Sequence, residues 1–317
     1  MRIAVLDAGT LGEKLDFSPL KEFGEVIIYD FSTPETVDAH VADADVILVN
    51  KLKINAATIA HADKLKLACL FSTGYDGVDL DYCRKKGIGV CNITAYCSNS
   101  VAQVTVAIVL NLAFHLNVFS RYIADGSYSR SGKANMLSPY FHEINGLTWG
   151  IAGYGSIGSR VGMTARSLGA QVIAYGRHPY EEVENVSLDE LCARSDILSV
   201  HLPLNPDTRN LFSAEKIARM KQGAIFVNMA RGAVADENAL AQALVSGKLG
   251  GLGADAFSSE PFGPDHPFFS LLGRDDVCFT PHMSWSSLEA RKKGLDLICN
   301  NIRSFLSGGT ECRIDLL

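Results

Sequence analysis

The chain has 317 residues and a formal net charge of −6, with 47% hydrophobic and 20% charged residues. This length exceeds one typical domain of ~100–200 residues and suits two. The composition is that of a globular protein with ample core, and the negative balance argues against a nucleic-acid partner, which calls for a basic face. Acidic and basic residues are interspersed, so we expect no charged tail and no low-complexity segment.

The first third of the chain alternates short apolar runs with helical patterns. The runs lie at residues 2–7, 26–30, 45–50, 66–73 and 88–93. Near-continuous apolar strands separated by helices indicate a parallel sheet covered on both faces. The first run has only four apolar residues before Asp7, too few for the core of a signal peptide, so we predict a strand there.

Residues 100–120 form the longest apolar stretch of the chain. Four polar side chains interrupt it, at Gln103, Asn111, His115 and Asn117. The stretch therefore favours a buried helix over a membrane span. An apolar helix of this length is more than one domain needs to cover. We expect a homodimer in which this helix is buried, and no membrane contact.

Six further runs follow this stretch. They lie at residues 148–153, 171–176, 196–202, 224–229, 251–256 and 277–282. Six strands alternating with helices match the doubly wound nucleotide-binding fold. The last stretch, from Ser286 to the end of the chain, is helical in pattern and has no strand of its own to cover. We expect it to cross back onto the first domain.

The cysteines show no pattern of a metal site or a disulfide framework. They are Cys69, Cys83, Cys91, Cys97, Cys192, Cys278, Cys299 and Cys312. None forms a C-x-x-C pair, and none has metal-ligand spacing with histidine. Scattered thiols without a secretion signal indicate a reducing compartment, so we expect a cytoplasmic protein without a metal centre.

The connection after the strand predicted at 148–153 is glycine-rich, with the sequence GIAGYGSIGSRVG. Gly153, Gly155 and Gly158 have the spacing G-x-G-x-x-G directly after a predicted strand and before a helix. In this context the first glycine permits a tight turn, the second lets the backbone approach a pyrophosphate, and the third lets the helix pack on the strand. The N–H groups of the helix N-terminus favour bound phosphate. We therefore predict a dinucleotide site, as opposed to a plain glycine turn.

The end of the next strand bears on which dinucleotide is bound. An acidic residue there accepts hydrogen bonds from the ribose hydroxyls of NAD and repels a 2′-phosphate. Here the position is Gly176, followed by Arg177 and His178. An arginine binds phosphate in a forked geometry, and hydrogen bonds to charged groups contribute ~1.5–3 kcal/mol, enough for a ~10–100-fold preference. We predict NADP(H) over NAD(H); the alternative is that Arg177 lies over the adenine or in solvent.

Three polar residues follow the ends of the last three strands. Arg231, Glu260 and His282 together offer a fixed cation, a carboxylate and an imidazole. An arginine can grip a substrate carboxylate, a histidine can supply a proton near neutral pH, and a glutamate can orient that histidine and favour its charged form. Each residue alone is more often structural. Their joint placement predicts the reduction of a 2-oxo acid by a nicotinamide.

Over essentially its whole length the chain resembles the D-isomer-specific 2-hydroxyacid dehydrogenases. The motifs that carry the resemblance are GYGSIG at 153–158, HLPLNPDT at 201–208, VNMARG at 227–232, DAFSSEP at 255–261 and TPH at 280–282. The resemblance implies that Arg231, Glu260 and His282 are the catalytic residues. It implies a bound cofactor contacted by Tyr154, Ser156, Ile157, Leu202, Pro203, Thr208, Ala230 and Asp255, the last near the nicotinamide carboxamide. It also implies that Gly74 and Tyr75 present N–H groups to the substrate carboxylate.

Several short stretches resemble the glycerate dehydrogenase or hydroxypyruvate reductase branch of that family. They are VNK at 49–51, TGY at 73–75, SVAQ at 100–103 and Trp285. On this basis Lys51 is a candidate substrate-binding residue. The sequence G-R-x-P from Gly176 resembles the NADPH-using glyoxylate and hydroxypyruvate reductases, whereas many relatives have aspartate there.

We therefore expect an α/β oxidoreductase with two doubly wound parallel-sheet domains and a cleft between them. Residues 1–97, completed by 286–317, form a flavodoxin-like substrate domain, and residues 98–285 form a Rossmann cofactor domain. The expected reaction reduces hydroxypyruvate or glyoxylate with NAD(P)H to D-glycerate or glycolate. The alternatives are another substrate branch, such as D-lactate, 3-phosphoglycerate or formate, and a catalytically silent nucleotide-sensing scaffold.

Overall fold

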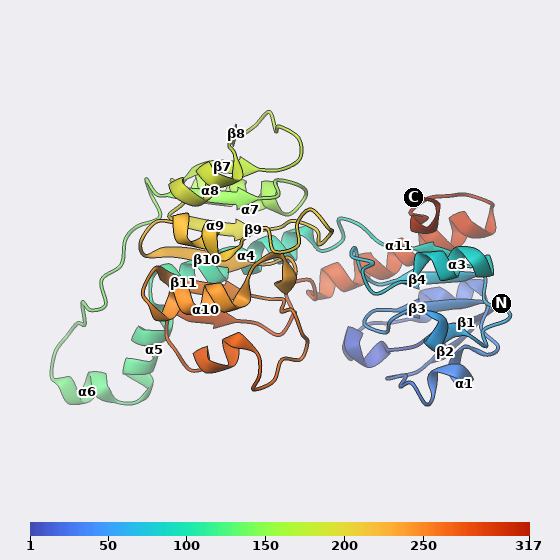
Figure 1. Cartoon of the computed structure of the whole chain (residues 1–317). Helices are drawn as coiled ribbons and strands as arrows, with labels where there is room; N and C mark the ends of the chain where they lie inside the picture. Colours follow the sequence, from blue (N-terminus) through green and yellow to red (C-terminus); the bar gives the residue numbers. More distant parts are fainter. The chain divides into compact units, whose positions relative to one another are not determined.

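The computed structural model describes residues 1–317, which divide into two compact units. The first unit comprises residues 1–97 and 285–317, and the second comprises residues 98–284. The second boundary lies one residue before the expected one, because the Trp285 ring packs 6.2 Å from that of Phe71 and 6.5 Å from that of Tyr96. Each unit is built on one sheet whose strands are all parallel (Figure 1).

The sheet of the first unit has five strands in the order β2-β1-β3-β4-β5, which is the flavodoxin-like order. Its strands are β1 (Arg2–Val5), β2 (Glu25–Ile28), β3 (Val46–Val49), β4 (Leu67–Leu70) and β5 (Gly89–Cys91). Its helices are η1 (Ala8–Leu11), η2 (Ser18–Phe23), α1 (Val37–Val41), α2 (Ala56–Ile59), α3 (Leu80–Lys86), α11 (Leu288–Leu306) and η5 (Ile314–Leu316). The strands are shorter than the apolar runs because their last residues turn into the loops.

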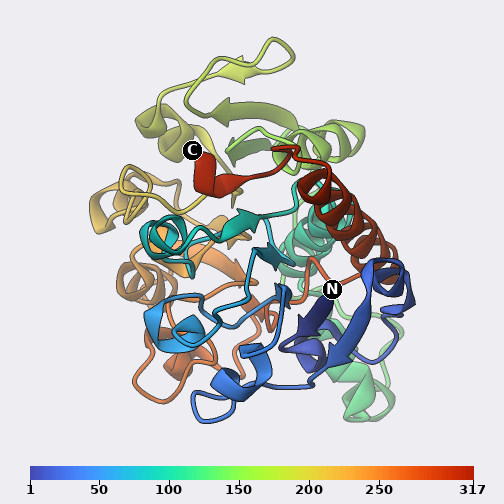
Figure 2. The same ribbon diagram turned by 90° about the vertical axis from the view of Figure 1, so that its right-hand side faces the viewer.

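Both faces of this sheet are covered. Alternate strand residues such as Ile47 and Val49 form a core with side chains of α1, α2 and α3. Helix α11 packs against β4 and η2 (Figures 1 and 2). A Cβ at Gly294 would lie 2.8 Å from the Phe71 ring, so the glycine lets α11 approach the sheet closely. The C-terminal helix thus packs on the sheet of the first unit, as expected.

The sheet of the second unit has seven strands in the order β12-β11-β10-β9-β6-β7-β8. The strands are β6 (Thr148–Ala152), β7 (Gln171–Tyr175), β8 (Glu184–Asn185), β9 (Ile197–Val200), β10 (Ala224–Asn228), β11 (Leu249–Ala254) and β12 (Val277–Phe279). The order contains the 3-2-1-4-5-6 arrangement of the Rossmann fold with one strand added. The two-residue β8 was not predicted, because its Glu and Asn are exposed and carry no apolar pattern.

Helices cover both faces of this second sheet (Figure 1). One layer contains α4 (Ser98–Ala113) and α7 (Gly158–Ser167), and the other contains α8 (Leu188–Arg194), α9 (Ala214–Arg219) and α10 (Glu237–Val245). The short helices α5 (Leu116–Ala124), α6 (Ser127–Ser131), η3 (Gly232–Val234) and η4 (Pro267–Leu271) complete the unit. Glycines at 251 and 253 admit α4, whose Leu112 and Ile108 lie where their side chains would be. The fold prediction of two doubly wound α/β units is therefore confirmed.

The single helix predicted for residues 100–120 is wrong. The structure breaks it at His115, which has a left-handed φ of 50°, and α5 leaves α4 at an angle of 68°. One face of α4 is buried, with Val101, Ile108 and Leu112 among its buried residues, whereas α5 has no buried residue. No single helix is long and apolar enough to cross a membrane; α4 and α5 pass that test only when they are taken together, by length and composition.

Candidate active site

The three predicted catalytic residues leave one edge of the seven-stranded sheet. Strands β10, β11 and β12 are neighbours, and Asn228, Ala254 and Phe279 lie in register across them. The N–H groups of Asp255 and Thr280 continue this row by binding Asn228 and Ala254. Because the strands are parallel, the segments that carry Arg231, Glu260 and His282 begin side by side at the carboxyl edge, where doubly wound folds bind ligands.

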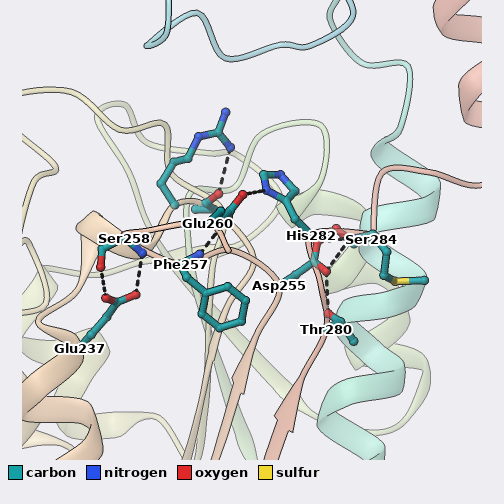
Figure 3. A network of polar contacts seen from close by, with 11 residues as sticks. Glu237, Asp255, Phe257, Ser258, Glu260, Thr280, His282 and Ser284 are labelled. Atoms are coloured by element: carbon teal, nitrogen blue, oxygen red, sulfur yellow. Dashed lines mark hydrogen bonds and ion pairs between the residues drawn. The ribbon is translucent and has the colours of Figure 1, made fainter. Parts of the chain in front are cut away.

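Glu260 and His282 are in direct contact. Nδ1 of His282 lies 2.7 Å from Oε2 of Glu260, and the two side chains are 22% and 30% exposed (Figure 3). An ionised carboxylate only accepts hydrogen bonds, so Nδ1 carries the ring proton. The second oxygen, Oε1, accepts the N–H of Phe257 at 3.0 Å. One oxygen of Glu260 is thus fixed by the backbone while the other binds the imidazole.

Asp255 holds the segment that carries His282. Its carboxylate is 2% exposed and accepts hydrogen bonds from the Thr280 hydroxyl (2.6 Å), Met283 N–H (2.9 Å), Ser284 N–H (3.0 Å) and the Ser284 hydroxyl. Each oxygen has two donors, which is about the capacity of a carboxylate. These bonds fix the turn around His282, whose φ is 51°. The contact with the nicotinamide carboxamide that the resemblance implies for Asp255 stays a prediction.

Arg231 lies on a turn that is fixed by Asn228, a buried residue that sequence analysis did not single out. The amide of Asn228 accepts the N–H of Ala230 at 3.0 Å and donates to the carbonyl of Arg231 at 2.9 Å. One guanidinium nitrogen of Arg231 donates to the carbonyl of Ala230. A buried asparagine at the end of a strand was the available signal, since buried amides need partners.

Gly232 brings the Arg231 turn against the Glu260 segment. A Cβ at Gly232 would lie 2.1 Å from the nitrogen of Ser258 and 2.2 Å from the carbonyl carbon of Phe257. Only a glycine permits so close an approach of two backbones. The segments of Arg231, Glu260 and His282 therefore form one connected group.

The glycine-rich loop fits a dinucleotide pyrophosphate. Gly153 has a φ of +91°, which the tight turn requires, and a Cβ at Gly158 would lie 2.1 Å from the Gly153 carbonyl oxygen. A Cβ at Gly155 would meet nothing within 4 Å, so the space over this residue is open. Gly153 and Gly158 thus have the turn and packing roles that the motif predicts, and the approach of a pyrophosphate to Gly155 stays a prediction. Ser156 and Ile157 complete the turn, and Ile157 precedes the first residue of α7.

The end of β7 lies beside this loop, because the N–H of Gly153 binds the carbonyl of Tyr175 at 2.8 Å. Arg177, two residues further, is exposed. Tyr180, which sequence analysis missed, fills the space beside Gly176: a Cβ there would lie 2.2 Å from its hydroxyl. That hydroxyl also accepts the N–H of Tyr154 at 3.3 Å. The place of the usual acidic side chain is thus taken by a tyrosine.

The segment after β9 carries three more predicted cofactor contacts, Leu202, Pro203 and Thr208. The Thr208 hydroxyl donates to the carbonyl of Pro203 at 2.6 Å, which closes the loop. His201 precedes them, and its carbonyl oxygen would lie 2.9 Å from a Cβ at Gly153. Burial lowers the pKa of His201 to about 3, and neither ring nitrogen has a hydrogen-bond partner. The imidazole is therefore neutral beside the glycine loop.

The predicted substrate-binding residues Lys51, Gly74 and Tyr75 lie on loops of the first unit. Asp7, which sequence analysis passed over, accepts the N–H of Lys51 at 2.6 Å and also those of residues 50 and 52. Burial raises the pKa of the Asp7 carboxyl, although these N–H groups oppose the shift. The hydroxyl of Ser72 binds the carbonyl of Gly74 at 2.7 Å. Both loops are thus held by nearby polar side chains.

Comparison with known proteins identifies the family. Residues 106–284 match the model of the family described as D-isomer specific 2-hydroxyacid dehydrogenase, NAD binding domain. The chain belongs to this family. It is 35% identical to a hydroxypyruvate reductase of Blautia hydrogenotrophica, across 97% of the chain and 98% of that protein. It is 33% identical to a glycerate dehydrogenase of Methylorubrum extorquens, across 87% of each.

Among solved structures, this member of the D-isomer specific 2-hydroxyacid dehydrogenases is similar to a D-lactate dehydrogenase from Aquifex aeolicus complexed with NAD and lactic acid. The TM-score is 0.85 and the identity 30%, over 98% of the chain and 97% of that structure. The two relatives named above belong to the branch that the sequence motifs resemble. The chain is therefore an oxidoreductase that acts on a CH–OH group with a nicotinamide cofactor, and the scaffold alternative finds no support.

Proposed function

We propose that the protein reduces a small 2-oxo acid, hydroxypyruvate or glyoxylate, to D-glycerate or glycolate. The observation that carries the proposal is the 2.7 Å contact between Nδ1 of His282 and Oε2 of Glu260, whose segment packs against the Arg231 turn. A cation beside an oriented imidazole is what the reduction of a 2-oxo acid needs. The names of the similar proteins support the substrate class.

Arg231, His282 and Glu260 have different roles in this reaction. When bound, the nicotinamide supplies a hydride to C2 of the substrate. The Arg231 guanidinium binds the substrate carboxylate and polarises the adjacent carbonyl. Because Nδ1 of His282 is bound to Glu260, Nε2 is the ring atom that gives a proton to the alkoxide oxygen. Glu260 keeps the ring in that orientation and stabilises its charged form.

The substrate is tested with a panel of 2-oxo acids, each at a fixed concentration of reduced cofactor, followed by the loss of nicotinamide absorbance. We expect hydroxypyruvate and glyoxylate to have the highest kcat/KM. A clear preference for pyruvate would favour the D-lactate alternative instead. Lys51, Gly74 and Tyr75 remain predicted substrate-binding residues, and replacing Lys51 by methionine is expected to raise KM.

For the cofactor we propose NADPH. Two features support this choice. Gly176 supplies no carboxylate, and the next residue, Arg177, is exposed at the end of the strand that binds the glycine loop. Without a carboxylate nothing repels a 2′-phosphate, and a guanidinium binds one. The comparison of kcat/KM with NADPH and with NADH tests this proposal, and a preference for NADH would contradict it.

We also propose that the protein is a cytoplasmic homodimer. All eight cysteines are free thiols. One face of α4 is buried, and exposed apolar side chains lie further along the chain, on α5, α6 and the segment after them. Leu137 in that segment is 73% exposed and Tyr140 is 85% exposed. Exposed apolar side chains in one region mark an interaction site. Sedimentation is expected to show a dimer, and a Leu137→Ser/Tyr140→Ser variant a monomer; a wild-type monomer would contradict the proposal.

A further inference from the structure

A buried polar cluster lies beneath the segment that carries Glu260. It consists of Glu237, Ser258 and His266, which are not among the predicted site residues. Glu237 and His266 are each 7% exposed. Figure 3 shows the Glu237 carboxylate directed at Ser258, next to the Phe257 and Glu260 side of the network. An ionisable side chain this deeply buried needs several partners.

The carboxylate of Glu237 has three donors. Its Oε1 accepts the N–H of Ser258 at 3.0 Å, and its Oε2 accepts the Ser258 hydroxyl. Nε2 of His266 lies 2.9 Å from the same Oε2. The Nδ1 atom of His266 accepts the N–H of Phe268 at 3.1 Å, so the ring proton is on Nε2 and is donated to Glu237.

Glu237 is more than a favourable residue at a helix start. It is the first residue of α10, where an acidic side chain is stabilised by the helix dipole. The cap of α10, however, is made by Asp236, which accepts the N–H of Ala239 at 3.0 Å. The Glu237 side chain instead binds a segment 21 residues further along the chain. The buried Glu237 side chain therefore holds the peptide between Phe257 and Ser258.

The peptide between Phe257 and Ser258 contacts both Glu260 and the turn that carries Arg231. The N–H of Phe257 binds Oε1 of Glu260, and Gly232, next to Arg231, packs on the Phe257–Ser258 peptide. A Cβ at Gly232 would lie 2.5 Å from Oε1 of Glu237 itself. A shift of this peptide would therefore move the carboxylate that orients His282 and the turn that carries Arg231.

We propose that Glu237 is a positioning residue for the reaction: by holding Ser258, it fixes the peptide on which Glu260 and the Arg231 turn rest. The inference depends on the proposed roles of Arg231, Glu260 and His282. It assigns Glu237 no contact with substrate or cofactor. Ser258 and His266 are its two partners in this function.

The test is Glu237→Gln, which keeps the shape but places an amide where Oε2 accepts two donors. We expect kcat/KM to fall about 10- to 100-fold, the effect of a small misplacement of reacting groups. In the dependence of kcat/KM on pH, the midpoint of the alkaline fall in activity should move to lower pH, because a displaced Glu260 stabilises the charged His282 less. Cofactor affinity should stay within about twofold of wild type, since a misplacement at the reacting groups acts on kcat/KM.

A readout without substrate is the tautomer of His282, observed through the ¹⁵N resonances of its ring. The wild type should hold the proton on Nδ1, and Glu237→Gln should give a mixture. Ser258→Ala should have a smaller effect in the same direction, because it keeps the N–H bond to Oε1. The matched control is Glu190→Gln, which loosens the capping box of α8 in the same unit and should change stability only.

Wild-type kinetics, pH profile and tautomer in a folded Glu237→Gln protein would overturn the inference. So would a pH shift of equal size in Glu190→Gln, because the effect would then follow stability alone. Failure of the proposed function would be seen differently, as an inactive wild type toward every 2-oxo acid of the panel. The tautomer measurement would still decide the role of Glu237 in that case.

Discussion

Asp255 binds Ser284 twice, through the backbone N–H and the hydroxyl of the same residue, two positions beyond His282. The carboxylate that follows β11 thereby sets the path of the chain that follows β12. Asp255 and Glu260 lie on one segment, so that segment holds His282 from two directions. This relationship makes the position of the imidazole a property of the backbone as much as of its own side chain.

The first prediction concerns these two hydrogen bonds between Ser284 and Asp255. Asp255→Asn replaces an acceptor by a donor opposite buried N–H and hydroxyl groups, which costs about 1–3 kcal/mol for each donor left without a partner. We expect a lower free energy of unfolding and a lower kcat, measured by urea denaturation and steady-state kinetics. Ser187→Ala, which removes the cap of α8 at a cost of about 1 kcal/mol, should lower stability and leave kcat unchanged.

The second prediction concerns the proton donor. His282→Asn should lower kcat about 10²- to 10⁴-fold, the usual contribution of a general acid. Glu260→Gln should have a smaller effect, because the imidazole remains but is no longer paired with a charge. Cofactor affinity, measured by fluorescence titration, should change little in either variant. A His282→Asn protein that keeps most of its turnover would show that another group supplies the proton.

The third prediction separates the roles of the glycines in the loop. Gly155→Ala should leave the melting temperature of the free protein unchanged, because the added Cβ meets nothing within 4 Å. It should weaken cofactor binding about tenfold or more, the equivalent of one charge-assisted hydrogen bond. Gly158→Ala should destabilise the fold, since its Cβ would lie 2.1 Å from the Gly153 carbonyl oxygen. Gly263→Ala, also in open space, is the control and should change neither property.

The fourth prediction tests the charge beside the loop. Arg177→Ser should reduce the ratio of kcat/KM with NADPH to that with NADH about 10- to 100-fold, the contribution of a hydrogen bond to a phosphate. Arg130→Ser removes an equal charge from α6 in the same unit, where Arg130 bonds to Asp125 and Ser127. That control should leave the ratio unchanged. An unaltered ratio in Arg177→Ser would mean that the guanidinium does not reach the 2′-phosphate.

The fifth prediction follows from the buried His201. Its folded-state pKa of about 3 lies below the usual 6.5, so the unfolded chain binds a proton that the folded protein does not bind. The resulting stability is complete above about pH 6.5 and is lost as the pH falls toward 3. His201→Leu should flatten the dependence of the unfolding free energy on pH between these values, as measured by urea denaturation at several pH values. The exposed His178→Gln is the control, and an equal slope in His201→Leu and wild type would contradict the prediction.

Local patterns in the sequence predicted all but one of the strands. Every predicted apolar run overlaps a strand, because buried parallel strands need continuous apolar residues, which can be read from the chain itself. The two-residue β8 lacked such a pattern, and the break at His115 was hidden because apolar side chains continue on both sides of it. The glycine loop was recognised because the spacing of its glycines is set by the backbone conformation and close approaches within the loop itself.

The sequence by itself determined two doubly wound units, the glycine loop, and the three residues that follow the last strands. Only the tertiary structure decided that Glu260 binds His282, that Gly232 packs on the Phe257–Ser258 peptide, and that Glu237 lies beneath it. The physical reason is that strand and turn propensities act between neighbours in the chain. The hydrogen bonds that connect the segments of the site join residues more than 20 positions apart, and these meet only when parallel strands bring their ends to one edge.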